Sequence, residues 1–219
     1  MIRKLLLAVA ALMLGAQFAA AQTPPPRFAT EIVAFETADA KAMPAKGGVL
    51  FLGSSSIRMW RTLAEDFPGT AVLNRGFGGS EIGDSVRYAD RIAIPYAPKT
   101  IVFYAGDNDI QAGKTPAQVL TAFKALTAKV HAALPDTRIL FVSIKPSIAR
   151  WGKAAEFREA NRLVRGFTES DKRLGYIDVF DAMLGADGMP RPELYLGDGL
   201  HMTAAGYAIW REKVAAALR

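Results

Sequence analysis

The sequence predicts a three-layer α/β/α sandwich built on a parallel, five-stranded sheet. Two observations lead to this fold class. Five short apolar runs rich in branched side chains recur along the chain, and stretches suited to helices separate them. Apolarity within the runs is continuous rather than alternating, which indicates strands buried on both faces, as in a parallel sheet covered by helices. The repeated order of strand and helix favours right-handed crossovers between the strands.

Each element can be placed on the chain. The predicted strands are GVLFLG, AVLNRG, TIVFYAG, RILFVSI and GYIDVF, at residues 48–53, 71–76, 100–106, 138–144 and 175–180. The predicted helices cover residues 57–66, 81–92, a stretch that begins at Thr115, 154–172 and 203–218. The helix after Thr115 has the clearest start, because a capping hydroxyl is followed by Pro116 and, three residues after the cap, by Gln118.

The first 21 residues have the pattern of a secretory signal peptide. MIRK carries positive charge, LLLAVAALMLGA is apolar, and Ala19-Ala20-Ala21 supplies small residues for cleavage before Gln22. The apolar run is shorter than the roughly 20 residues that a membrane span requires. We therefore expect an exported protein, periplasmic or secreted, without a stable membrane anchor. Residues 1–21 are the signal peptide, 22–46 an N-terminal leader segment and 47–219 the folded domain.

The composition argues against several classes of function. The net charge of +6 is spread along the chain, and it falls by two when Arg3 and Lys4 leave with the signal peptide. Without a dense basic stripe, a nucleic-acid partner is not expected. The chain has no cysteine, so it can form neither a disulfide nor a thiolate metal site. The sequence gives no indication of an oligomeric state.

Polar clusters follow three of the predicted strands. The first strand leads into Gly53-Ser54-Ser55-Ser56, the second into a glycine-rich loop at 74–80, and the third into Gly106-Asp107-Asn108-Asp109. Functional groups of a parallel sheet gather at the carboxyl ends of its strands. A serine at a strand-to-helix turn suits a nucleophile, because the start of a helix stabilises developing negative charge. Glycines allow a backbone N–H to approach a substrate oxygen, and an asparagine amide can donate to the same oxygen.

Only two histidines are available to activate a serine. His201 closes the run GDGLH before the last helix and lies three residues after Asp198, close enough for the carboxylate to orient the imidazole. His131 lies near the end of a predicted helix, where a histidine is favourable beside the C-terminal carbonyls without any catalytic role. We interpret His201 as the candidate base and His131 as structural.

The blocks GSSS, GFGGS, GDND and DGLH resemble, in this order, the GDSL/SGNH family of serine esterases and lipases. The resemblance extends from Val49 to Tyr207. It implies a flavodoxin-like SGNH hydrolase fold, with residues 47–219 as the catalytic domain and with no cofactor. It further implies Ser55 as nucleophile, His201 as general base and acid, and Asp198 as the orienting carboxylate.

The same resemblance implies an oxyanion hole formed by the backbone N–H groups of Ser55 and Gly79 and by the side-chain amide of Asn108. The chain departs from the family at Ser54, where the family has an aspartate, and this departure bears on the rigidity of the turn. Gly83-Asp84-Ser85-Val86 is closer to the family's name than GSSS is. Ser85 nevertheless falls inside a predicted helix with no strand before it, so we interpret it as structural.

Other kinds of site fit the sequence less well. An EF-hand at Asp107 would need glycine and glutamate where the chain has Ala112 and Gln118, so no metal site is predicted. An α/β-hydrolase elbow would need a second glycine where Ile57 stands. A catalytically silent periplasmic module that binds a glycan or another ligand on the same fold remains an alternative.

The substrate is less well defined than the chemistry. Arg150 and Trp151 follow the fourth strand and are the better candidates for substrate contact. Arg58 and Trp60 follow the nucleophile turn and could also line the cleft. The alternative for Trp60 is that it packs in the core. A chain without a long lid insertion favours small or exposed esters. Short-chain acyl esters and carbohydrate O-acetyl esters are therefore the leading expectation, with lysophospholipid and thioester hydrolysis as alternatives.

Overall fold

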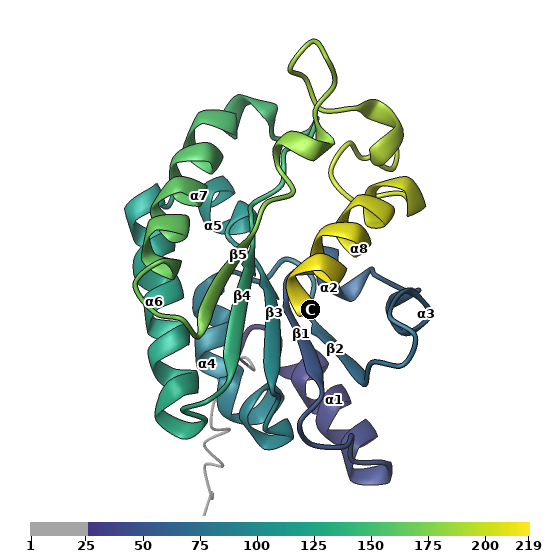
Figure 1. Cartoon of the computed structure of the whole chain (residues 1–219), viewed down its shortest axis with the longest axis vertical. Helices are drawn as coiled ribbons and strands as arrows, with labels where there is room; N and C mark the ends of the chain where they lie inside the picture. The colour runs from purple at the N-terminus through teal and green to yellow at the C-terminus, as the bar shows by residue number, and fades with distance from the viewer. Residues whose placement is uncertain (1–25) are drawn as a thin grey trace, which may run out of the picture.

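The computed structural model describes residues 26–219, so the predicted signal peptide at 1–21 lies outside the described part of the chain. Five parallel strands form one sheet in the order β2-β1-β3-β4-β5 (Figure 1). The predicted sheet is thereby confirmed. The strands are β1 (Val49–Gly53), β2 (Val72–Gly76), β3 (Thr100–Tyr104), β4 (Arg138–Val142) and β5 (Leu174–Ile177).

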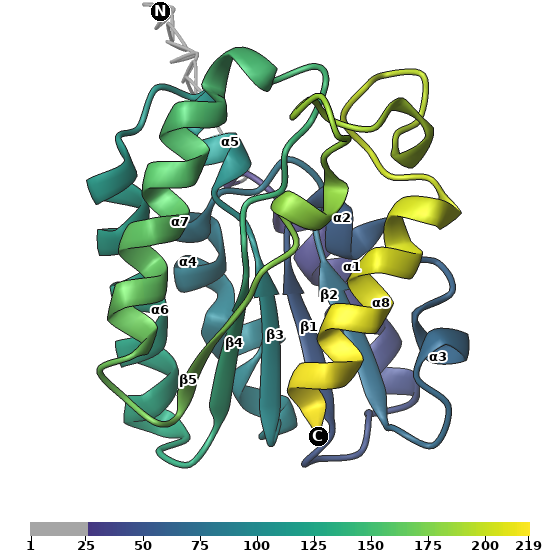
Figure 2. The ribbon, with the colours of Figure 1, turned by 45° about the horizontal axis from the view of Figure 1, so that its top comes forward.

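Helices cover both faces of this sheet. One layer contains α1 (Ala29–Lys41), α4 (Ile82–Ile92), α6 (Pro116–Ala133) and α7 (Ala154–Thr168). The other contains α2 (Ser55–Arg58), α3 (Leu63–Asp66) and α8 (Ala204–Leu218). In Figure 2, α8 crosses in front of the sheet and α4 lies behind it. Strand side chains alternate between two cores, so that Leu50 and Leu52 pack with the first layer and Phe51 with the second.

The segment expected to be a leader contains a helix that belongs to the first layer. Ile32 of α1 is completely buried. Glu36 accepts two hydrogen bonds of 2.6 Å from the Arg91 guanidinium of α4, and Asp39 forms an ion pair with Arg75 at the end of β2. Helix α1 is thus packed and tied to the domain that carries the sheet.

Residues 57–66 were expected to form one helix, but the structure divides this stretch into α2 and α3. Trp60 lies at the break and is only 1% exposed. Its ring packs edge-on against Phe51, and its Nε1–H donates to a carboxylate oxygen of Asp66 at 2.6 Å. Burial of the indole and satisfaction of its N–H outweigh the modest gain from continuing a short helix.

Helix α7 ends at Thr168, four residues before the predicted end. The carboxylate of Asp171 accepts a hydrogen bond of 2.9 Å from the backbone N–H of Arg173, and this local turn leads directly into β5. The other predicted helices agree with the structure to within a residue or so at their starts, and Thr115 and Gln118 form the expected capping box of α6.

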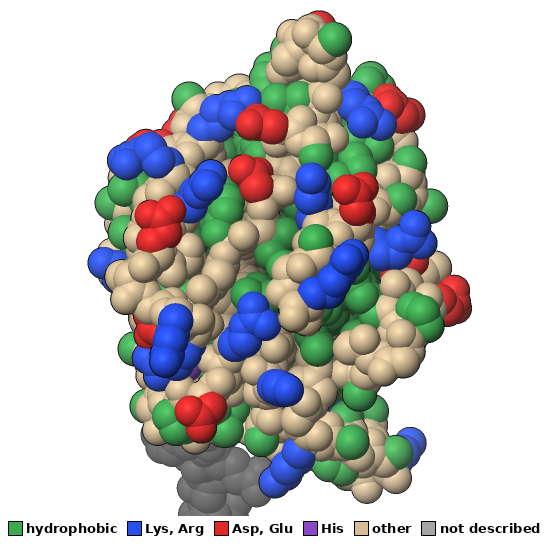
Figure 3. All heavy atoms as spheres, viewed as in Figure 1, with side chains coloured by type: hydrophobic (Ala, Val, Ile, Leu, Met, Phe, Trp, Pro, Cys, Tyr) green, Lys and Arg blue, Asp and Glu red, His purple; other side chains and the backbone are tan. Residues whose placement is uncertain are grey.

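The surface carries mixed charge. On the face shown in Figure 3, the lysine and arginine side chains are interspersed with aspartate and glutamate. Within residues 26–219, no helix has the length and apolarity needed to cross a membrane.

Candidate active site

Ser55 lies where β1 turns into α2. The preceding Gly53 has φ +137°, and a Cβ at this position would lie 1.8 Å from the carbonyl oxygen of Tyr104, so only glycine fits the turn. The Ser54 N–H donates to that same carbonyl at 2.9 Å. The turn therefore fixes the Ser55 side chain, which is largely buried, at the carboxyl edge of the sheet between β2 and β3.

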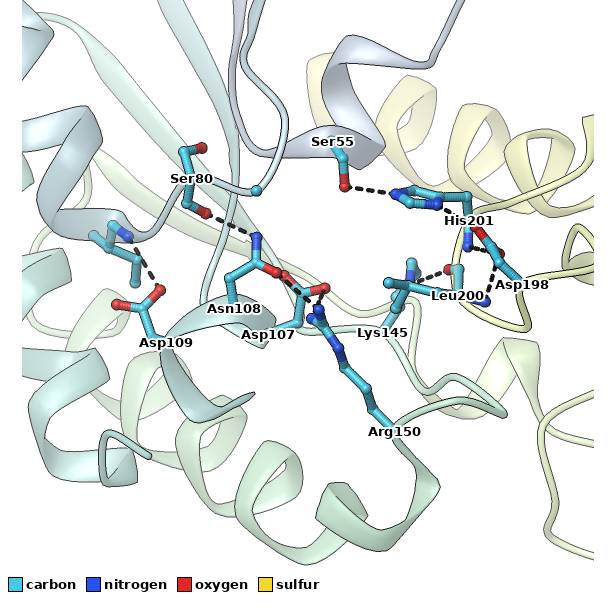
Figure 4. Close-up of polar contacts among 12 residues, drawn as sticks. Ser55, Ser80, Asp107, Asn108, Asp109, Lys145, Arg150, Asp198, Leu200 and His201 are labelled. Atoms are coloured by element: carbon cyan, nitrogen blue, oxygen red, sulfur yellow. Dashed lines mark hydrogen bonds and ion pairs between the residues drawn. The ribbon is translucent and has the colours of Figure 1, made fainter. Parts of the chain in front are cut away.

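Ser55, His201 and Asp198 form one continuous row of hydrogen bonds (Figure 4). Ser55 Oγ lies 3.0 Å from His201 Nε2, and His201 Nδ1 lies 2.6 Å from Asp198 Oδ2. With a neutral imidazole protonated at Nδ1, the histidine donates to the aspartate and accepts the serine hydroxyl proton at Nε2. This is the arrangement needed to withdraw a proton from the serine.

Asp198 is held in its ionised form. The His201 ring and the backbone N–H groups of His201 and Leu200 donate to its carboxylate, and these hydrogen bonds lower the pKa of Asp198 to about 2. The carboxylate side chain is 48% exposed and the imidazole 22% exposed, so the row opens to solvent at its Asp198 end.

The three N–H donors expected to form the oxyanion hole follow β1, β2 and β3, which are neighbours in the sheet. Asn108 belongs to α5 (Asp107–Gln111), which begins directly after β3. Its Nδ2 donates to the Ser80 carbonyl at 3.0 Å, which leaves the second amide hydrogen available. Gly79 has φ +77°, a left-handed conformation that favours glycine. Among residues 26–219, the backbone N–H groups of Ser55 and Gly79 donate to no protein acceptor.

Arg150 contacts the same loop. Its Nη2 donates to Asn108 Oδ1 at 3.0 Å, and its Nη1 donates to Asp107 Oδ2 at 2.9 Å. The Arg150 side chain is only 14% exposed. Because the guanidinium cannot accept a hydrogen bond, it fixes which end of the Asn108 amide is oxygen and directs Nδ2 toward the Ser80 side.

Asp109 anchors this loop to its neighbours. Its Oδ2 accepts from the Ile82 N–H at the start of α4, at 3.1 Å, and its Oδ1 accepts from Lys114 at 3.0 Å. Burial raises the pKa of Asp109 above the ordinary value, although Lys114 opposes the shift. Asp109 thus ties α5 to α4 without pointing toward Ser55 (Figure 4).

The model of the GDSL-like lipase/acylhydrolase family matches residues 47–209, which is most of the chain. The chain belongs to this family. It is accordingly a carboxylic ester hydrolase of the SGNH hydrolase superfamily, as its four sequence blocks had indicated. No curated protein matches the chain.

Solved structures share the fold of this acylhydrolase. A Streptococcus pneumonia protein that is provisionally named a platelet activating factor is 22% identical, with a TM-score of 0.77 over 87% of this chain and 92% of that one. A GDSL-like lipase from Bacteroides thetaiotaomicron is 17% identical, with a TM-score of 0.72 over 85% and 96%. A carbohydrate esterase of family 3 from Talaromyces cellulolyticus is 17% identical, with a TM-score of 0.58 over 78% and 96%.

Ser85 and His131, the alternative serine and histidine, take no part in the hydrogen bonds of the row. Ser85 is completely buried in α4, and among the described residues its hydroxyl has no hydrogen-bond partner. His131 Nε2 lies 3.0 Å from the Thr137 carbonyl at the far end of α6. Trp60 belongs to the core, and Trp151 packs partly buried against the first layer in a short 3₁₀ turn.

Two further buried residues of the acylhydrolase lie beside the elements that carry the site. Ser54, which replaces the family aspartate, is completely buried, and within residues 26–219 its hydroxyl has no partner. Its backbone nevertheless holds the turn at both ends, because its carbonyl accepts from the N–H groups of Ile57 and Arg58. Lys145, which sequence reasoning did not single out, lies beneath the Asp198–His201 loop and donates to the Leu200 carbonyl at 2.8 Å.

In the part of the chain that is described, no three histidine, aspartate or glutamate side chains gather in a way that could hold a metal ion. The groups assembled at Ser55 are instead a hydroxyl, an imidazole, a carboxylate and several N–H donors. Together they can abstract a proton and stabilise an oxyanion.

Proposed function

We propose that this acylhydrolase is a serine esterase in which Ser55, His201 and Asp198 form the catalytic triad. The observation that carries the proposal is the unbroken row from Ser55 Oγ through the imidazole to Asp198 Oδ2, with distances of 3.0 and 2.6 Å. A row of this kind is the general arrangement for activating a serine nucleophile.

In the first half of the reaction, Ser55 Oγ forms a bond to the ester carbonyl carbon while its proton passes to His201 Nε2. The carbonyl oxygen becomes an oxyanion. When this intermediate collapses, the bond to the alcohol oxygen breaks, and the proton on Nε2 passes to the departing alcohol. The acyl group is left on Ser55.

In the second half, a water molecule attacks the acyl-enzyme and gives a proton to His201 Nε2. Collapse of the new intermediate breaks the bond to Ser55 Oγ, which recovers its proton from the imidazole, and the carboxylic acid leaves. In both halves the ionised Asp198 stabilises the imidazolium that forms transiently.

The oxyanion is stabilised by the backbone N–H groups of Ser55 and Gly79 and by the free amide hydrogen of Asn108. The lack of protein acceptors for the two backbone donors among residues 26–219 supports this role. We assign Arg150 to positioning the Asn108 amide, since its guanidinium is directed at Asn108 and Asp107. Trp151 remains the candidate for contact with the substrate.

The preferred substrates are short-chain acyl esters and carbohydrate O-acetyl esters. The solvent exposure of His201 and Asp198 supports this class, because an open site admits an ester attached to a bulky alcohol. The fold shared with a carbohydrate esterase is consistent with it. The mixed charge on the face shown in Figure 3 offers no support for a nucleic-acid partner.

A substrate panel tests this proposal. Purified protein is assayed on esters of increasing acyl length, on an O-acetylated glycan, on a lysophospholipid and on an acyl thioester, with Ser55→Ala as the blank. We expect acetyl and other short-chain esters to give the highest kcat/KM. If the lysophospholipid or the thioester is turned over faster than the short-chain esters, the proposed substrate class is wrong and the faster substrate defines the class.

We further propose export to the periplasm or beyond, with cleavage after Ala21, on the strength of the sequence pattern at 1–21. The mass of the protein recovered from the exported fraction should correspond to a chain that begins at Gln22. Retention in the cytoplasm with residues 1–21 attached would contradict the proposal.

A further inference from the structure

Lys145 is a fully buried lysine directly under the proposed catalytic row. It follows β4 by three residues, and the residue is 1% exposed. Its Nζ donates to the Leu200 carbonyl at 2.8 Å, and Leu200 is the residue immediately before His201 (Figure 4). Lysine is almost never fully buried without an ionic partner, so this location calls for a reason.

The ammonium lacks a close counter-ion. Within residues 26–219, no carboxylate oxygen lies within 4.0 Å of Nζ. The charged groups that face it are Asp107 and Asp198, which attract it, and Arg150, which repels it. The ring of Tyr195 lies 5.8 Å away, and the buried Tyr104 is a further titratable neighbour.

Burial lowers the pKa of Lys145 to about 8. Between this value and the ordinary value for lysine, the unfolded chain binds more protons than the folded one, so folding becomes more favourable as pH rises through this range. At neutral pH the buried charge therefore opposes folding. A group retained at the expense of stability is a candidate for a functional role.

The contact that Lys145 makes differs from the others that hold the loop. Three successive carbonyls, those of Gly199, Leu200 and His201, each accept one hydrogen bond. The first accepts from the Ala149 N–H at 3.0 Å and the third from the Leu196 N–H at 2.7 Å. Of the three, only the Leu200 carbonyl accepts its hydrogen bond from a side chain. Loss of Lys145 should therefore leave the loop folded and free only its centre, between Asp198 and His201.

We propose that Lys145 is a positioning residue, whose ammonium fixes the Leu200 carbonyl and thereby keeps Asp198 and His201 in line with Ser55. The proposal rests on the proposed function, because it assigns Lys145 to the row that performs it. A charged donor makes a shorter and stronger hydrogen bond than a neutral amine, so the positioning weakens when Lys145 loses its proton.

The neighbours of Lys145 that have a shifted pKa do not change protonation near pH 8. Hydrogen bonds hold the pKa of Asp198 at about 2, and burial raises the pKa of both Tyr104 and Tyr195 above the ordinary value of 10. Arg150 is a guanidinium, which keeps its charge in proteins. A loss of activity centred near pH 8 therefore reports on Lys145.

The test compares Lys145→Met with a control, Lys172→Met, which replaces a lysine that is distant from Lys145 in the sequence. Steady-state kinetics on a short-chain ester and the thermal unfolding midpoint are measured for both. For Lys145→Met we expect kcat to fall on the order of 10-fold to 100-fold with little change in KM, as expected for misplaced catalytic groups. The unfolding midpoint should stay the same or rise, because an apolar side chain replaces a buried charge.

Lys172→Met should match the wild-type protein in both measurements. A wild-type kcat in Lys145→Met, or a lowered unfolding midpoint with kcat unchanged, would overturn the proposal and leave Lys145 a structural residue. If the wild-type protein hydrolyses no ester at all, the proposed function fails first, and this result is distinguishable because it appears without any substitution.

The pH profile of kcat supplies a second, independent arm. The wild-type enzyme should lose activity above an apparent pKa near 8, whereas this alkaline decline should be absent from Lys145→Met and from Lys145→Gln. Lys145→Gln, which keeps a neutral donor, should retain more activity than the methionine variant. A wild-type profile that stays level from pH 7 to about 10, the ordinary range for lysine, would overturn the proposal even if neither variant folds.

Discussion

His201 lies at the centre of the hydrogen-bonded row, with Ser55 on one ring nitrogen and Asp198 on the other. We predict that His201→Ala lowers kcat by about 10³-fold or more, since members of a triad act as a unit. His131→Ala is the matched control and should leave kcat unchanged, because the hydrogen bond of the His131 ring is with the Thr137 carbonyl and not with Ser55. Steady-state assays of both variants check this. Equal losses in the two variants would refute the assignment of the base.

An imidazole base also predicts a direction of pH dependence. The protonated imidazole cannot accept the serine proton. Activity should therefore fall as the pH is lowered and the ring takes up a proton. Asp198, with its pKa of about 2, should contribute nothing above pH 4. Full activity at pH 4, measured as kcat/KM, would rule out an imidazole base.

Asn108 provides a test of the oxyanion hole. We predict that Asn108→Ala lowers kcat by about 10²-fold or more with little effect on KM, because the amide binds charge that exists only in the transition state. Asp109→Asn is the neighbouring control. It should lower kcat less, since Asp109 anchors Ile82 and Lys114 and not the substrate. A rise in KM alone for Asn108→Ala would make Asn108 a ground-state binding residue.

At the scale of residues, sequence reasoning identified the groups with distinctive local surroundings. Ser55, Asn108 and His201 each lie in a short motif, and the structure brings them to one edge of the sheet. Arg150 was expected only to contact the substrate, and Lys145 was not singled out. Their contacts with Asn108 and Leu200 join residues 42 and 55 positions apart, and no local pattern records such a pairing.

At the scale of elements, the cap of α6 offers a direct test of the predicted helix start. Thr115 accepts from the Gln118 N–H, and the Gln118 side chain accepts from the Thr115 N–H. Thr115→Ala should lower the free energy of unfolding by about 1 kcal/mol. Thr121→Ala, within the same helix, should cause no loss because alanine is the better helix former. Urea denaturation measures both, and equal effects would contradict the role of the cap.

The strands were predictable because short, continuous apolar runs bounded by turn residues strongly favour buried strands. All five lie within three residues of the predicted bounds. The structure adds to or departs from the predicted elements where tertiary contacts decide the outcome. Helix α1 is held by Arg75 and Arg91, which are distant in sequence. The break between α2 and α3 follows from burial of Trp60 in a core completed by α8. Neither contact leaves a signal in the local periodicity.

At the scale of the whole molecule, the order of the strands determines how the site is assembled. β1 lies between β2 and β3, so the turns that carry Ser55, Gly79 and Asn108 are neighbours at one edge. This much follows from a parallel sheet. His201 arrives differently, from the loop between β5 and α8, as α8 crosses the second face and packs Trp210 against Tyr104. The sequence singled out His201 as the candidate base, but no local pattern showed how the chain returns to Ser55.

Activation of one serine, out of several close together, is central to the proposed mechanism. A fluorophosphonate probe reacts covalently with an activated serine hydroxyl, and mass spectrometry of the digested protein identifies the residue that carries it. We predict that the label is on Ser55, that Ser85→Ala labels at the wild-type rate, and that Ser55→Ala does not label while keeping its thermal unfolding midpoint. Label on Ser54, Ser56 or Ser85, or ester hydrolysis that persists in Ser55→Ala, would contradict the mechanism.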